Sequence, residues 1–298
     1  MRILVTGSEG LLGSWTVPVL RAAGHEVVTL DIKTRSSSGG ERHIAGDLRD
    51  VFVARNAVQG MDAVVHLAAM PYDAAPPDQV LAINVPGTWN ICAACEEAGV
   101  PRIVYASSIN ALGAVGGYQS AKYLPIDDAY PCHPAPGYQL SKYLSDEICR
   151  SYTYRFGLTT LSLRFGAIIE PPSPDQNARR RWSFSMMPPP VRIQMGIHEY
   201  WAYIDVRDAA DAVLKACTVE GVEHETFLIF ADDSTVDVPT IQLVTEYHPD
   251  IPWPKVSLED YVAEDPHRSL MDCAKAKRVL GWQPQHSWRA YPEVARPW

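Results

Sequence analysis

The chain has 298 residues, of which 47% are hydrophobic, so it can bury one large core. Its formal net charge is −9 and its charged residues are scattered, which leaves no basic field to attract a nucleic-acid backbone. The sequence opens on a strand-like segment rather than a signal segment, and no run approaches the roughly 20 apolar residues of a membrane helix, so we expect a cytoplasmic protein without membrane contact.

Short β-branched segments alternate with longer segments of helical periodicity in the first part of the chain. The strand-like segments are residues 3–5, 27–30, 63–66, 103–105 and 160–163. This alternation is typical of right-handed βαβ crossovers. We therefore predict an α/β fold, with a Rossmann-type doubly wound parallel sheet.

The pattern changes after about Gly166, where a Pro- and Arg-rich stretch over residues 171–190 predicts an irregular loop over the active site. Strands are then expected at residues 201–204 and 226–229, with helices at 206–217 and at a C-terminal run that ends near Gly281. These segments predict a nucleotide-binding domain over residues 1–165, to which the chain returns at about 201–230. Residues 166–200 and 231–298 are expected to form a smaller substrate-binding lobe.

Glycines at positions 7, 10 and 13 follow the first predicted strand and open the first predicted helix. This spacing permits a tight turn and lets the backbone approach a pyrophosphate at a helix N-terminus. Asp31 ends the second predicted strand, where an acid would bind the adenosine ribose hydroxyls. Its carboxylate would repel the additional phosphate of NADP, so NAD is the expected cofactor, although Lys33 and Arg35 could bind that phosphate.

Tyr138 and Lys142 follow a plausible helix start at Pro136 and Gly137, so the two side chains should lie one helical turn apart on the same face. We expect the Lys142 ammonium and a positive nicotinamide ring to lower the pKa of Tyr138 by about 3 from its usual value near 10. The phenol would then act as a base or acid near neutral pH. Ser108, just beyond the strand at 103–105, would hold the reacting oxygen, because ligands bind at strand carboxyl ends.

These motifs resemble the extended short-chain dehydrogenase/reductase family, also described as the NAD-dependent epimerase/dehydratase family. The matching segments run along nearly the whole chain and are 6–13, Asp31, 46–48, 66–69, 84–88, 107–108, Tyr138 with Lys142, 203–208 and 272–282. The resemblance implies an enzyme with a small-molecule substrate. It also implies a homodimer that pairs through the helices at about 79–98 and 138–156.

The resemblance further implies the residues of the site, with no metal among them. The expected catalytic residues are Ser108, Tyr138 and Lys142. The expected cofactor-binding residues are Gly7, Glu9, Gly10, Leu11, Leu12, Gly13, Asp31, Ile32, Asp47, Leu48, Leu67, Ala68, Ala69, Asn84, Ala106, Ser107, Tyr138, Lys142, Phe165 and Gly166. The expected substrate-binding residues are Met70, Ser108, Ile109, Asn110, Tyr138 and Ala167.

Within that set, the resemblance places Asp47 and Leu48 at the adenine, Ala68 and Ala69 along the ribose and phosphates, and Lys142 at the nicotinamide ribose. Asn84 would support a water-linked proton path near the lysine, or is simply a helix residue. His66 is more simply read as a core histidine at a strand end.

Three departures from the family pattern bear on the substrate. Gly166 stands where nucleotide-sugar epimerases carry an asparagine on the diphosphate, and Trp201 and Ala202 stand where they carry an arginine before Tyr203. A further phosphate-binding arginine expected near Val262 is also missing. A diphosphate would thus lose charge-assisted bonds of roughly 1.5–3 kcal/mol each. Ile109 and Asn110 replace the acidic pair of the dehydratases, which argues against dehydration.

Residues 163–166, with Glu170 and Pro171, resemble the corresponding segment of uronate dehydrogenases and related oxidoreductases of free sugars more than that of the nucleotide-sugar enzymes. The arginines at 179–181 could bind a substrate carboxylate or phosphate, or belong to a solvated loop. Our leading hypothesis is an NAD-dependent dehydrogenase that oxidises a carbinol of a free sugar, sugar acid or similar polyol. The alternative is a sugar epimerase that retains its cofactor. A cofactor-binding regulator without chemistry is a third possibility, disfavoured by the intact Tyr138 and Lys142 pair.

Overall fold

The computed structural model describes residues 1–34, 42–72, 74–171 and 188–290. Within them, a sheet of seven parallel strands in the order β3-β2-β1-β4-β5-β6-β9 forms the centre of the molecule. The strands are β1 Arg2–Thr6, β2 Glu26–Asp31, β3 His43–Ala45, β4 Ala63–His66, β5 Arg102–Ser108, β6 Thr159–Phe165 and β9 His224–Ile229. The predicted α/β class with a doubly wound parallel sheet is confirmed.

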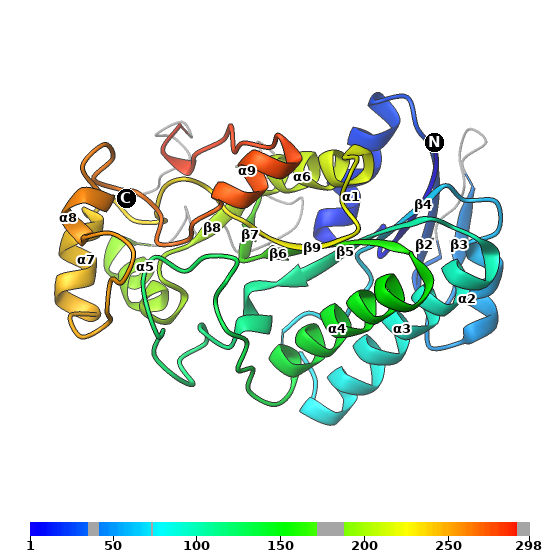
Figure 1. Cartoon of the computed structure of the whole chain (residues 1–298), viewed down its shortest axis with the longest axis horizontal. Helices are drawn as coiled ribbons and strands as arrows, with labels where there is room; N and C mark the ends of the chain where they lie inside the picture. Colours follow the sequence, from blue (N-terminus) through cyan, green and yellow to red (C-terminus); the bar gives the residue numbers. More distant parts are fainter. Residues whose placement is uncertain (35–41, 73, 172–187, 291–298) are drawn as a thin grey trace.

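Helices cover both faces of this sheet, as Figure 1 shows. One face carries α1 Leu11–Ala22 and α6 Val206–Thr218, with α9 Ala274–Leu280 beside α6; the other carries α2 Val51–Ala57, α3 Pro77–Ala98 and α4 Tyr138–Phe156. The alternation of side chains along β1 explains this arrangement. Ile3 and Val5 join the apolar cluster under α1 and α6, whereas Leu4 joins the cluster under α2, α3 and α4.

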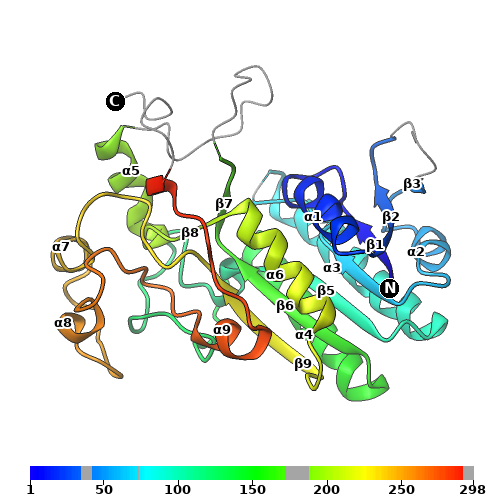
Figure 2. The same ribbon diagram turned by 90° about the horizontal axis from the view of Figure 1, so that it is seen from above.

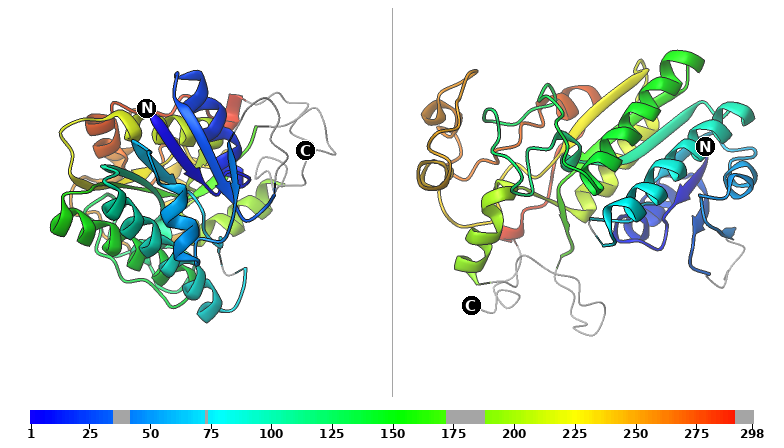
Figure 3. Two further views of the ribbon diagram at one scale, coloured as in Figure 1. Left: turned by 90° about the vertical axis from the view of Figure 1, so that its right-hand side faces the viewer. Right: turned by 90° about the horizontal axis from the view of Figure 1, so that it is seen from below.

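A second, smaller part lies at one end of the sheet (Figures 1 and 2). It contains a two-stranded parallel sheet of β7 Ala167–Ile169 and β8 Tyr203–Asp205, with the helices α5 Pro189–Gly196, α7 Thr240–Tyr247 and α8 Leu258–Tyr261. Three short 3₁₀ helices complete the described elements: η1 Ile109–Leu112, η3 Ile197–Glu199 and η4 Trp288–Ala290. The further views in Figure 3 show α7 and α8 at the opposite end of the molecule from β3. Strands β6 and β9 lead at their carboxyl ends directly into this second part.

The structure departs from the predicted elements in a few places. Strands β3 and β7 were not anticipated, because three residues give too short a pattern to detect. The strand predicted at 201–204 begins at Tyr203, since Tyr200 and Trp201 have positive φ values of 52° and 51° that no strand tolerates. Residues 172–187 of the predicted loop, which include the arginines at 179–181, lie outside the described residues, and helix α5 follows them.

Candidate active site

The glycine turn after β1 packs directly against the segment that follows β4. Gly7 has a φ of +68°, and a Cβ atom there would lie 2.7 Å from the backbone nitrogen of Ala68. A Cβ atom at Gly13 would overlap the carbonyl oxygen of Gly7. Glycine is therefore required at both positions. Because β2 and β4 flank β1 on opposite sides, the turn lies where the strand order reverses, the usual place for a nucleotide in such sheets.

Asp31 lies at the carboxyl end of β2 and is only 8% exposed. Its two carboxylate oxygens accept hydrogen bonds from the backbone N–H groups of Glu9 and Lys33, each at 3.0 Å. The carboxylate thus joins the glycine turn to the end of β2, a structural role that the sequence did not reveal. Ile32 beside it is 75% exposed. Arg35, the second candidate for a phosphate contact, lies outside the described residues.

The segment after β3 contributes Asp47 and Leu48, which differ in their surroundings. Asp47 accepts from Nε and Nη2 of Arg49, and this hydrogen bonding lowers the pKa of Asp47. Leu48 is buried against α2 and α3, and its carbonyl accepts from Nδ2 of Asn90 at 2.8 Å. The two adjacent residues thus present one polar group near the surface and one apolar group beneath it.

Asn84 of α3 holds the segment after β4 in place. Its Oδ1 accepts from the Met70 N–H at 2.8 Å, while its Nδ2 donates to the Met70 carbonyl at 3.1 Å and to Ser141 Oγ at 3.0 Å. These bonds tie three elements together, namely α3, the segment after β4 and α4. Asn84 is therefore more than an ordinary helix residue.

His66 ends β4 inside the core. Its Nδ1 shares a hydrogen bond of 2.8 Å with Thr6 Oγ1, and its ring stacks on Tyr105 with 5.6 Å between centroids. Burial, together with the charge of Lys142, lowers the pKa of His66 to about 3. The side chain is thus a neutral core histidine, as the simpler interpretation held.

Tyr138, Lys142 and Ser108 come together at the carboxyl edge of the sheet. Gly137, with a φ of 89°, precedes Tyr138, the first residue of α4. One turn later, Lys142 lies with Nζ 5.7 Å from the centroid of the Tyr138 ring and donates to the Ala106 carbonyl at 2.7 Å. Ser108 ends β5 and forms a hydrogen bond with Tyr138. The spacing predicted from the sequence thus produces one compact group.

Burial dominates the protonation of this group in the protein alone. Burial raises the pKa of Tyr138, and the hydrogen bond with Ser108 opposes that rise only in part. Burial also lowers the pKa of Lys142, to about 8, so the ammonium is mostly protonated at neutral pH. The expected acidity of Tyr138 therefore depends on the positive charge of the nicotinamide ring.

The other predicted residues line the same edge with different exposures. Ser107 Oγ is buried and, among the described residues, has no hydrogen-bond partner. A Cβ atom at Gly166 would overlap the Phe230 ring, so no larger side chain fits there. Ile109 is 2% exposed and packs into the core, whereas Asn110 donates from Nδ2 to Ser108 Oγ at 3.2 Å.

One residue beside the centre has no sequence motif that would have identified it. Tyr72 follows the segment after β4, and its ring centroid lies 6.0 Å from that of Tyr138. Its φ of 51° is in the left-handed region, which is uncommon for a non-glycine residue. A strained tyrosine against the central tyrosine belongs to the candidate site.

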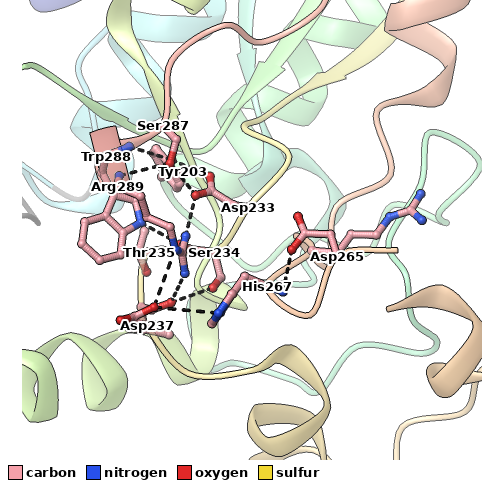
Figure 4. Close-up of polar contacts among 12 residues, drawn as sticks. Tyr203, Asp233, Ser234, Thr235, Asp237, Asp265, His267, Ser287, Trp288 and Arg289 are labelled. Carbon is pink, nitrogen blue, oxygen red and sulfur yellow. Dashed lines mark hydrogen bonds and ion pairs between the residues drawn. The ribbon is translucent and has the colours of Figure 1, made fainter. Parts of the chain in front are cut away.

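A polar network fixes the second part (Figure 4). The carboxylate of Asp233, which follows β9, accepts from the Tyr203 hydroxyl at 2.6 Å, the Ser287 hydroxyl at 2.6 Å and Nη1 of Arg289 at 2.5 Å. The Trp288 N–H donates to the Tyr203 hydroxyl at 3.1 Å. These contacts join β8 to the C-terminal segment, and no sequence motif predicts them.

Two further findings concern the described ranges only. No group of three or more His, Cys, Asp or Glu side chains gathers there in a way that could hold a metal ion. None of the helices in those ranges is both long and apolar enough to cross a bilayer.

Comparison with known proteins gives one family and several relatives. Residues 3–229 match the model of the NAD dependent epimerase/dehydratase family. The chain is 29% identical to uronate dehydrogenase of Pseudomonas syringae pv. tomato over 180 residues, covering 60% of this chain and 62% of that enzyme, which is less than two thirds of its length. It is 27% identical to UDP-glucose 4-epimerase of Corynebacterium glutamicum over 316 residues, covering 96% of this chain and 92% of the epimerase.

Two more proteins are similar to the chain. The L-arabinose 1-dehydrogenase (NAD(P)(+)) of Haloferax volcanii is 32% identical over 175 residues, which cover 56% of this chain and 67% of that enzyme. A short-chain dehydrogenase/reductase superfamily protein of Agrobacterium tumefaciens, solved with bound NAD, has a TM-score of 0.76 at 23% identity and covers 99% of this chain and 96% of its own. At this sequence identity, the similarity to the solved structure shows a shared fold.

Proposed function

Because the chain belongs to the NAD dependent epimerase/dehydratase family, we propose that it is an NAD-dependent dehydrogenase that oxidises a carbinol of a free sugar, sugar acid or similar polyol. The observation that carries this proposal is the group of Tyr138, Lys142 and Ser108 at the sheet edge that also holds the glycine turn. A phenol, an ammonium and a hydroxyl in contact can move one proton to or from a substrate oxygen.

The edge of the sheet fits a dinucleotide. The turn at Gly7 and Gly13 excludes side chains and so lets a pyrophosphate approach the backbone at the start of α1. Asp31 and Ile32 would bind the adenosine ribose, and Asp47 and Leu48 would hold the adenine. Segments 67–69, 106–107 and 165–166 would hold the nicotinamide half. In this proposal residues 1–165, with 201–230, hold the cofactor, and residues 166–200 and 231–298 hold the substrate.

The three central residues have separate roles in this proposal. A nicotinamide ring held there would supply the acceptor for the hydride of the carbinol carbon. Tyr138 accepts the hydroxyl proton at its phenolic oxygen, and Ser108 positions the substrate oxygen. Lys142 binds the nicotinamide ribose and, with the charge of the oxidised ring, offsets the burial that raises the pKa of Tyr138. Asn84 positions Met70 and Ser141 around them.

Two positions favour a free sugar over a nucleotide sugar. At Gly166 the Phe230 ring occupies the space that a diphosphate-binding asparagine would need. At Trp201, where an arginine would stand, the indole is 1% exposed and donates from Nε1 to the Ile193 carbonyl at 3.0 Å. Neither position offers a cation or amide to a diphosphate, and a buried indole cannot be exchanged for one without repacking.

The second candidate is a sugar epimerase, favoured by the similarity to the Corynebacterium epimerase over 96% of the chain. An epimerase uses the same phenol but returns the hydride to the opposite face, so its cofactor is not consumed. The stoichiometry of NADH distinguishes the two functions.

The test is to incubate the purified protein with NAD, or with NADP at equal concentration, and a panel of free sugars, sugar acids and nucleotide sugars. We expect NADH to accumulate in proportion to a free sugar or sugar acid consumed. We also expect NAD to be preferred, because the Asp31 carboxylate disfavours a ribose phosphate. Reaction of nucleotide sugars alone, or product without net NADH, would contradict the dehydrogenase, and a clear preference for NADP would contradict the cofactor.

We also propose a homodimer formed through α3 and α4. The two helices pack against each other and carry exposed aromatic side chains at Trp89 and Phe156, which are 54% and 51% exposed and whose rings both pack on the ring of Tyr152. Exposed aromatic residues gathered on one face are typical of interfaces. Sedimentation at micromolar concentration should give twice the 33.0 kDa chain mass. A monomer that persists at that concentration would rule this interface out.

A further inference from the structure

The segment that follows β4 runs from the glycine turn to the proposed catalytic centre. Its start at Ala68 packs against the glycine turn. Its middle is fixed at Met70, whose N–H and carbonyl both form hydrogen bonds with the Asn84 side chain. Tyr72 comes two residues later, and its ring centroid lies 6.0 Å from that of Tyr138. The segment therefore places a second aromatic ring beside the phenol that is proposed to move the proton.

Tyr72 differs from the residues that share its backbone conformation. Within the described ranges, the non-glycine residues with positive φ are Tyr72 at 51°, Tyr200 at 52° and Trp201 at 51°. Tyr200 and Trp201 are 3% and 1% exposed, and their side chains form hydrogen bonds of 2.8 and 3.0 Å. Tyr72 is 66% exposed. Packing offsets the cost of the left-handed backbone at the two buried residues, but it contributes little at Tyr72.

The two neighbours of the Tyr138 ring differ in their exposure. The Lys142 ammonium lies 5.7 Å from the centroid of that ring, and Lys142 is only 3% exposed, so it is the interior neighbour. Tyr72 is the neighbour that faces solvent. Its ring is tilted by 37° to the Tyr138 ring rather than stacked face to face, and most of its surface stays accessible. A substrate that reaches Tyr138 from solvent therefore meets an aromatic surface beside it.

An exposed aromatic ring at this place suits one kind of substrate group. The face of an aromatic ring is electronegative, because its π electrons form a quadrupole. A ring-closed sugar carries several weakly electropositive C–H groups on one face, and these can pack on such a surface while the hydroxyls point away from it. An open-chain polyol rotates about each of its C–C bonds, so it presents no fixed face and loses more conformational freedom on binding.

We infer that Tyr72 is a substrate-binding residue whose exposed ring stacks on the C–H face of a ring-closed sugar and holds that sugar against Tyr138. This inference rests on the proposed function and narrows its substrate class to ring-closed sugars and sugar acids, to the exclusion of open-chain polyols. Stacking fixes the plane of the sugar and thereby selects the carbinol that lies at the phenolic oxygen. The left-handed backbone of Tyr72 is the strain that this placement requires.

The test compares each sugar with the open-chain compound that reduction at C1 produces: D-glucose with D-glucitol, D-galactose with galactitol, and D-galacturonate with L-galactonate. Calorimetry measures the Kd of each compound for the enzyme loaded with NADH, and turnover with NAD is followed separately as NADH formation. Tyr72→Phe keeps the ring, whereas Tyr72→Gly removes it and suits the positive φ. Tyr154→Ala is the control, because Tyr154 is a 74% exposed tyrosine of α4.

We expect the wild-type protein to bind at least one ring-closed sugar at least tenfold more tightly than its open-chain form. Tyr72→Gly should weaken the binding of that sugar at least tenfold. Its NAD affinity should be unchanged and its Tm no lower than that of the wild type, because glycine relieves the backbone strain. Tyr72→Phe and Tyr154→Ala should bind the sugar as the wild type does.

Several results would overturn the inference: tighter binding of the open-chain forms, no binding of any of the compounds, wild-type sugar affinity in Tyr72→Gly, or equal losses in Tyr72→Gly and Tyr72→Phe. A lower Tm in Tyr72→Gly would also overturn it, because the tyrosine would then serve the fold. Ring-dependent binding without NADH formation would instead contradict the proposed dehydrogenase and leave the role of Tyr72 intact. NADH formation from an open-chain polyol alone would do the reverse.

Discussion

The glycine turn after β1 and the Asp233 network after β9 hold the two parts of the molecule in different ways. The turn is a contact between backbones, in which Gly7 meets Ala68 and a single side chain, Asp31, ties the turn to β2. The network is a contact between side chains, in which one carboxylate gathers groups from β8 and the C-terminal segment. The turn depends on the lack of a Cβ atom at glycine. The network depends on the Asp233 carboxylate, which accepts all three hydrogen bonds.

The largest effect should follow from Asp233→Ala. The change would leave the Tyr203 hydroxyl, the Ser287 hydroxyl and the Arg289 guanidinium without the carboxylate they share, at a cost of about 3–5 kcal/mol in the free energy of unfolding. The matched control is Asp237→Ala, because the Asp237 carboxylate is 78% exposed and lies 3.8 Å from the same arginine. That control should cost about 1 kcal/mol at most.

Urea denaturation measures both variants, and hydrogen exchange locates the loss. Exchange should increase first in β8 and the C-terminal segment, while NAD affinity in the folded protein stays near that of the wild type. If Asp233→Ala and Asp237→Ala lowered the free energy of unfolding equally, the Asp233 network would not hold the second part. The difference drawn here between the network and the glycine turn would then be wrong.

A smaller loss of stability but a larger loss of NAD affinity should follow from Gly7→Ala. A Cβ atom there meets the Ala68 backbone, and the φ of +68° adds strain, for a total cost of roughly 1–3 kcal/mol. Gly24→Ala is the control, because Gly24 has a φ of +85° and nothing within 4 Å of its Cβ position. Both variants carry the strain of a positive φ, and only the first has the collision.

Fluorescence titration with NADH should show at least a tenfold weaker affinity for Gly7→Ala and no change for Gly24→Ala. If both variants bound the dinucleotide equally well, the turn would not be where the pyrophosphate approaches the backbone.

The same contrast explains which parts could be predicted from the sequence. The turn, the helical spacing of Tyr138 and Lys142, and the parallel sheet follow from local patterns, since each depends on a few adjacent residues. The Asp233 network joins residues more than 50 positions apart, and no local pattern relates them. Its geometry exists only after the chain has folded.

One expectation failed for a reason that is also non-local. The strand expected from residue 201 begins two residues later, because Tyr200 and Trp201 adopt left-handed conformations that their buried partners stabilise. The acidity expected of Tyr138 includes the charge of the nicotinamide ring and stays a prediction, since burial raises the pKa of Tyr138 in the protein alone.

The most direct measurement of the central claim is turnover of Tyr138→Phe with the best sugar of the panel, alongside NAD affinity. Removal of one phenolic oxygen should leave NAD affinity unchanged and reduce kcat by about 10²–10⁴ fold, the usual contribution of a general acid or base. Tyr154→Phe, at an exposed tyrosine of the same helix, should leave kcat unchanged. Undiminished turnover in Tyr138→Phe would contradict the account and place the chemistry elsewhere in the molecule.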